Sequence, residues 1–89
     1  LNVRNRIYAE LLRLAKKQAI VSNTTIISPS PARVDLANLV GTVREIVSKE
    51  LTKLENEKVI LRKNDHGELH ILDVARLTEM VKSAYGSLY

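Results

Sequence analysis

The chain has 89 residues, of which 45% are hydrophobic and 27% charged, and its formal net charge is +4. This length fits a single domain, and the apolar fraction is that of a globular protein, so wholesale disorder is excluded. Cysteine is absent and no apolar run approaches the ~20 residues of a membrane helix, which argues against disulfides, thiol catalysis, cysteine-ligated zinc and a membrane span.

Residues 2–18 are predicted to form an amphipathic helix, because apolar residues recur at steps of three and four. This apolar stripe consists of Val3, Ile7, Leu11 and Leu14. Residues 1–33 hold six basic residues against one acidic residue, and most of the basic ones lie off the stripe. A basic segment of this kind favours nucleic acid, an anionic membrane surface or an acidic partner.

A loop-like stretch with one short strand follows the first helix. Thr25, Ile26 and Ile27 are β-branched and favour a strand. We expect Ser30 to cap a helix over residues 31–40, with a proline at its first position. This helix is expected to bury Leu36, Leu39 and Val40, and to end at Gly41, which permits a positive φ.

Another helix is predicted over residues 43–56, with Val47, Leu51 and Leu54 on its inner face. After this helix the spacing of apolar residues changes, and residues 59–62 and 68–72 are predicted to form two strands. The turn sequence KNDHG joins them. Asp73 is expected to cap a last helix that carries Val74, Leu77 and Val81 on one face. Two short helices joined at a glycine and followed by a hairpin predict a winged helix-turn-helix over residues 1–89. Its class is α+β, mainly α with a small β-hairpin.

The outer face of the 43–56 helix carries the most informative side chains. At ~100° per residue, a sector of ~140° holds Arg44, Glu45, Ser48 and Lys49. Arginine donates twice to guanine, a carboxylate accepts from cytosine, and lysine reaches guanine or phosphate. The same pattern also fits a solvated face with a salt bridge from Glu45 to Lys49 at i, i+4.

Residues 35–55 read DLANLVGTVREIVSKELTKLE. The elements D-L-A, V-G, R-E-x-V-S and L-x-x-L-E resemble the helix-turn-helix of the Crp/Fnr family (cyclic-AMP receptor/fumarate-nitrate regulator) of bacterial transcription factors. The runs VILR and HILD resemble that family's wing, and RIYAELLRLA resembles the helix that enters its DNA-binding domain. The resemblance covers nearly the whole chain.

The resemblance implies sequence-specific binding of double-stranded DNA, with residues 43–56 in the major groove, and no enzymatic activity. It places Arg44, Glu45 and Lys49 at base-reading positions, and Ser48 is expected to join them because it shares their sector of the helix. The DNA backbone is expected to meet Arg33, Thr42, Lys63 and His66. The chain departs from the family at Val43 and Ile46, where hydroxyl side chains are common, and at Lys49, where arginine is usual.

The resemblance also has implications for the longer protein to which the domain would belong. The chain is expected to be a fragment of a longer cytoplasmic bacterial protein that forms a homodimer and contacts RNA polymerase, without a membrane partner. The effector-binding and dimerisation regions are expected upstream, so no cofactor is expected in this chain. The main alternative is a winged helix whose Arg44, Glu45 and Lys49 contact another protein.

Other chemistry is weakly supported. His66 and His70 lie four residues apart across a hairpin turn, which does not bring two side chains together as it would on a helix, so no metal site is expected. Ser48 has no histidine nearby to act as a base, so nucleophilic catalysis is not expected.

Overall fold

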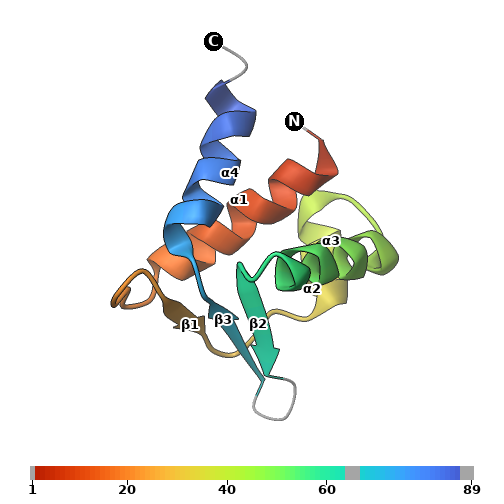
Figure 1. The fold of residues 1–89 in the computed structure, drawn as a ribbon. Coiled ribbons are helices and arrows are strands. Elements are labelled where there is room, and N and C mark those ends of the chain that lie inside the picture. Colours follow the sequence, from red (N-terminus) through yellow and green to blue (C-terminus); the bar gives the residue numbers. More distant parts are fainter. Residues whose placement is uncertain (1, 64–66, 87–89) are drawn as a thin grey trace.

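The computed structural model describes residues 2–63 and 67–86. Four helices and a three-stranded sheet follow one another in the predicted order (Figure 1). The elements are α1 (Val3–Lys16), β1 (Thr25–Ile27), α2 (Arg33–Val40), α3 (Arg44–Asn56), β2 (Ile60–Lys63), β3 (Glu68–Ile71) and α4 (Val74–Gly86). This arrangement confirms the predicted α+β class and the winged helix-turn-helix.

The sheet is antiparallel, with strand order β1–β3–β2. The central strand β3 pairs with both neighbours, and the Cα partners of its His70 are Ile26 in β1 and Leu61 in β2. The sequence predicted each strand but grouped only β2 and β3 into a hairpin. Because β1 pairs with a strand more than forty residues away, no local turn signal announced its place in the sheet.

One hydrophobic core joins the sheet to the helices. Figure 1 shows α1 and α4 crossing above the sheet, with α2 and α3 beside them. The predicted inner face of α3 is confirmed, since Val47, Leu51 and Leu54 are all buried. They share the core with residues including Ile7, Leu11, Leu36, Ile60, Leu69, Ile71 and Leu77.

The start of α2 differs from the prediction. Ala32, not Ser30, is the N-cap residue, and its side chain makes no capping hydrogen bond. The backbone N–H of Ser30 instead donates to the carbonyl oxygen of Gly67 at 2.6 Å. The chain before α2 is therefore tied to the wing, and the helix begins at Arg33 rather than at residue 31.

The inner face of α2 also differs. Leu39 was expected in the core but is 62% exposed, while Leu36, Ala37 and Val40 are buried. An eight-residue helix presents a narrow stripe, and here i, i+1 and i+4 face inward. Gly41 ends the helix with φ of 78°, as predicted.

The start of α4 is capped by two side chains. Asp73 accepts a hydrogen bond from the backbone N–H of Arg76 at 2.9 Å, which confirms the predicted cap. Asn23 donates to the same Asp73 carboxylate and accepts from the backbone N–H of Ala75. The hydrogen bond from the Arg76 N–H, followed by that from the Asn23 side chain, holds the pKa of Asp73 below its usual value.

Candidate nucleic-acid interface

The middle of α3 is fixed in rotation by a buried carboxylate. Glu50 is only 7% exposed and faces α1. Its Oε1 accepts hydrogen bonds from the Tyr8 hydroxyl at 3.0 Å and from Arg4 Nε at 3.1 Å. Burial, followed by the hydrogen bond to Glu50, raises the pKa of Tyr8 to about 12. Any rotation of α3 about its axis would break these contacts.

Sequence reasoning missed this network. The available signal was that Glu50 lies on the inner side of α3, next to the stripe of Val47, Leu51 and Leu54. Tyr8 likewise follows Ile7 on the inner side of α1. A carboxylate at the border of an apolar face needs partners, but their identity depends on how α1 packs against α3.

The C-terminal half of α3 is joined to strand β2 by hydrogen bonds between side chains. Arg62 of β2 donates from Nε to Oε1 of Glu55 at 3.0 Å, and its Nη2 also reaches the hydroxyl of Thr52. The hydrogen bond from Arg62 lowers the pKa of Glu55. These contacts link β2 to the C-terminal part of α3.

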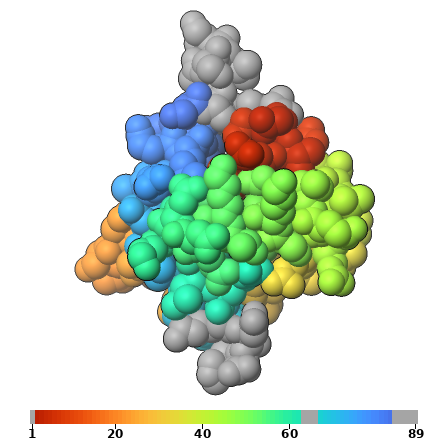
Figure 2. All heavy atoms as spheres, turned by 45° about the vertical axis from the view of Figure 1, so that its right-hand side comes forward, coloured from red at the N-terminus to blue at the C-terminus, as the bar shows by residue number. Residues whose placement is uncertain are grey.

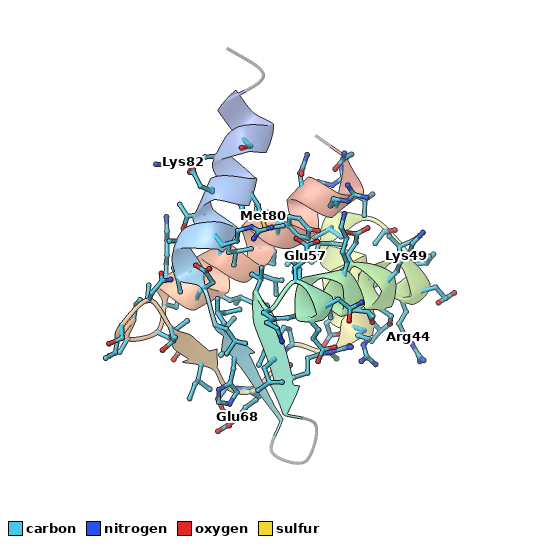
Figure 3. All side chains as sticks on the ribbon, viewed as in Figure 1. Arg44, Lys49, Glu57, Glu68, Met80 and Lys82 are labelled. Atoms are coloured by element: carbon cyan, nitrogen blue, oxygen red, sulfur yellow. The ribbon has the colours of Figure 1, made fainter. Side chains whose placement is uncertain are left out.

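With α3 anchored at its middle and near its C-terminal end, the predicted base-reading residues face solvent. Arg44, Glu45 and Lys49 are exposed, and Ser48 is half-buried. Figure 3 shows Arg44 and Lys49 extending outward from the N-terminal end of α3. Within residues 2–63 and 67–86, no ion pair includes Arg44, Glu45 or Lys49. The salt bridge of the solvated-face interpretation is thus not formed.

The predicted backbone-contacting residues are only partly brought together. Arg33, the first residue of α2, and Arg44 line one shallow hollow of about 270 Å³ with Ala32 and Val34. Thr42 lies in the turn between α2 and α3 and is half-buried. The backbone of Lys63 ends β2, while His66 lies outside the described residues. Figure 2 shows α3 on the forward face, between α1 above and β2 below.

Two aliphatic side chains border this charged surface. Val43 is the N-cap residue of α3, is 55% exposed, and makes no capping hydrogen bond with its side chain. Ile46, in the first turn of the helix, is 39% exposed. The turn just before Val43 is approached by a cation, since Arg6 Nη2 lies 4.0 Å from where a Cβ on Gly41 would stand.

The described residues do not assemble a metal site. They contain no group of three or more His, Cys, Asp or Glu side chains placed to hold an ion. His70 Nε2 lies 3.1 Å from a carboxylate oxygen of Glu68 on the same strand. Within the described part of the chain, no helix has the length and apolar character to span a membrane.

Comparison with known proteins gives a family match and a set of structural neighbours. A family model described as the Crp-like helix-turn-helix domain matches residues 5–80. No curated protein sequence matches the chain. TTHB099, a CRP-family transcriptional regulator from Thermus thermophilus, is 28% identical with a TM-score of 0.73, over 91% of this chain and 40% of that one.

Two further structures share the fold at lower identity. The CO-dependent transcription factor CooA from Carboxydothermus hydrogenoformans is 22% identical with a TM-score of 0.78, over 90% of this chain and 37% of that one. Oxidized CprK in complex with o-chlorophenolacetic acid is 20% identical with a TM-score of 0.80, over 91% of this chain and 34% of that one. The chain therefore spans between 34 and 40% of the length of these three proteins.

Proposed function

The chain belongs to the family of Crp-like helix-turn-helix domains, which makes it a DNA-binding domain of transcription regulation and not an enzyme, and we propose that it recognises a specific DNA sequence by placing α3 in the major groove. The observation that carries this proposal is the outer face of α3. Three exposed charged side chains gather near its N-terminal end without internal ion-pair partners in the described chain, while a buried carboxylate fixes the rotation of the helix.

The chemistry of these side chains matches base edges. The guanidinium of Arg44 donates two parallel hydrogen bonds to O6 and N7 of guanine. The carboxylate of Glu45 accepts from the amino group of cytosine, and Lys49 donates to guanine or to a phosphate. Ser48 lies between them and offers a hydroxyl at short range. An α-helix with its side chains is ~10–12 Å across and fits the ~12 Å major groove.

Contacts to the DNA backbone supply most of the affinity. Arg33 lies at the N-terminus of α2, where the helix dipole also favours a phosphate, and shares a hollow with Arg44. Thr42, Lys63 and His66 complete the proposed set on the turn and the wing. Each cation that neutralises a phosphate releases a counterion, so binding weakens as salt rises.

The longer protein is proposed to act as a homodimer in the bacterial cytoplasm. Two copies of α3 would then enter successive major grooves ~34–36 Å apart on a near-palindromic site. RNA polymerase is the proposed protein partner at the promoter. The alternative, a winged helix that contacts another protein through Arg44, Glu45 and Lys49, predicts no steep dependence of DNA binding on salt.

The test compares two arginines that are proposed to do different work. A duplex enriched from a random library by the 89-residue chain is compared with a scrambled duplex at several salt concentrations. Arg44→Ala should cost ~1–3 kcal/mol on the enriched duplex and relax the preference at one base pair. Arg33→Ala should weaken both duplexes about equally and make the salt slope shallower by about one.

Lys82→Ala is the matched control, because it removes one exposed positive charge from α4, away from Arg44 in Figure 3. It should leave both affinities nearly unchanged. Equal proportional losses from Arg44→Ala on the two duplexes would show that α3 does not read bases.

A further inference from the structure

The start of α3 exposes two branched aliphatic side chains that folding does not explain. An N-cap residue normally carries a Ser, Thr, Asn or Asp oxygen that accepts a hydrogen bond from the first turn. Val43 occupies this position with no acceptor and with 55% of its surface exposed. Ile46, 39% exposed, is not among the residues that form the core or pack against it.

The position of these residues is that of the proposed DNA-binding surface. Val43 directly precedes Arg44, and Ile46 directly follows Glu45. Arg6 Nη2 approaches Gly41, two residues before Val43, so a cation lies near the turn that leads into α3. The pair therefore lies at the N-terminal end of α3, beside the charged face rather than within it.

We infer that Val43 and Ile46 read thymine through its C5-methyl group. This inference rests on the proposed entry of α3 into the major groove. Neither side chain can donate or accept a hydrogen bond, so neither can bind a phosphate or a polar base edge. The methyl group of thymine is the apolar group that base pairs present in the major groove. Contact with it removes apolar surface from water on both partners.

The consequence is a second, non-polar element of specificity. Arg44 and Glu45 select a G·C pair by hydrogen bonds, while Val43 and Ile46 select thymine at flanking positions by the fit of methyl groups. Serine at either position would instead donate a hydrogen bond to a phosphate and give up the thymine preference.

The experiment replaces single thymines by deoxyuridine, which lacks only the methyl group. The probe is the duplex that the 89-residue chain enriches from a random library, with each thymine replaced in turn. The parent chain should lose about fourfold in affinity at one or two thymines that flank the pair read by Arg44, the cost of one buried methyl group.

Val43→Ser and Ile46→Ser should each abolish the loss at one of these thymines, so that the thymine and deoxyuridine duplexes bind the variant equally. Val43→Ser also supplies the missing N-cap oxygen, so an unfolded helix cannot account for this result. The control is Val21→Ser, because Val21 is 66% exposed in the segment between α1 and β1, which Figure 1 places away from α3. It should retain the fourfold loss.

Three outcomes overturn the inference. A sequence preference without any thymine effect, or with an effect that both serine variants retain, contradicts methyl reading and leaves the proposed function standing. Concentration-dependent self-association that Val43→Ser and Ile46→Ser remove, without a thymine effect, assigns the pair to a contact between copies. If the library yields no preferred sequence, the proposed function fails as well.

Discussion

Glu50 and Glu45 show how two carboxylates on one helix take opposite roles through burial alone. Glu50 is enclosed between α1 and α3 and accepts hydrogen bonds from Tyr8 and Arg4. Glu45 is exposed and has no ion-pair partner among the described residues. A buried charge needs its internal donors, whereas an exposed one is free to meet a ligand.

Removing the Tyr8 hydroxyl should destabilise the fold. In Tyr8→Phe, the ring still fills its place in the core, but the buried Glu50 carboxylate loses a donor at 3.0 Å. The expected loss in the free energy of unfolding is ~1–3 kcal/mol, measured by urea denaturation. Tyr8→Phe combined with Glu50→Leu should recover most of this loss, because no unsatisfied charge remains. A parent-like stability of Tyr8→Phe would show that the hydrogen bond has no net effect.

Removing the Glu45 carboxylate should separate affinity from specificity. Glu45→Ala takes a negative charge away from a surface proposed to face phosphates, so binding to a scrambled duplex should tighten. Binding to the enriched duplex should gain less or weaken, because the acceptor for cytosine is lost. Titrations of both duplexes at one fixed salt concentration measure the ratio. An unchanged ratio would exclude Glu45 from base reading.

At the scale of elements, three different kinds of contact fix the position of α3. Glu50 ties its middle to α1, the apolar stripe ties its inner face to the core, and Glu55 ties its end to β2. These contacts join α3 to α1, to the core and to β2 on the side proposed to meet DNA.

The packing of the inner face of α3 against the core is tested by Leu51→Ala. Leu51 is buried on the inner face of α3, and truncating such a leucine leaves a cavity. The expected cost is ~2–5 kcal/mol in the free energy of unfolding. Leu39→Ala offers the comparison, because Leu39 is exposed on α2 and its truncation removes no core contact. A loss of less than about half a kcal/mol in Leu51→Ala would contradict the packing of α3, since core truncations cost several times more.

The contribution of the Glu55–Arg62 contact to the free energy of unfolding should depend on pH. The hydrogen bond from Arg62 keeps the pKa of Glu55 below its ordinary value of 4.5. A carboxyl whose pKa is lower in the folded state stabilises that state above pH 4.5, and this contribution is lost as the pH falls through the folded pKa. Stability measured from about pH 6 down to about pH 2 should therefore fall less steeply in Glu55→Gln than in the parent. Arg62→Gln should flatten the same region, because it removes the donor. If both variants followed the parent's slope, the Glu55–Arg62 contact would not contribute.

At the scale of the whole molecule, the proposed homodimer requires one copy of this chain to meet one half of a two-fold site. The chain measures 38 × 30 × 23 Å, while the half-sites of dimeric helix-turn-helix proteins lie ~34–36 Å apart. In the proposed complex, a single copy would present one α3 to one major groove. The isolated chain would then lack the affinity that a second, linked copy adds.

The isolated chain should therefore bind duplex DNA weakly and with strong dependence on salt. Non-specific dissociation constants of this kind are ~10⁻⁴–10⁻⁶ M at physiological salt. The logarithm of affinity should fall linearly with the logarithm of salt concentration, as counterions are released from the phosphates. Fluorescence anisotropy of a labelled scrambled duplex measures the slope. A flat plot between low and moderate salt would support the protein-contact alternative.

The sequence by itself determined the elements that depend on local chemistry. The 3.6-residue stripes of α1 and α3, the turn at Gly41, the β-branched residues of β1 and the Asp73 cap are all set by neighbours along the chain, and each was predicted in place. The outward face of α3 was also predictable, because the face of the helix that is apolar is buried and the opposite face is then exposed. Burial of Val47, Leu51 and Leu54 leaves Arg44, Glu45 and Lys49 in solvent.

Tertiary structure alone decided the contacts between residues distant in sequence. The pairing of β1 with β3, the partners of Glu50, and the tie from Ser30 to Gly67 that moves the start of α2 all join segments more than thirty residues apart. Leu39 is exposed for the same reason, since only the packing of α2 selects which of its apolar residues face inward. Hydrophobic periodicity shows which face of a helix or strand is apolar. Which other element packs against that face is decided only when the chain folds.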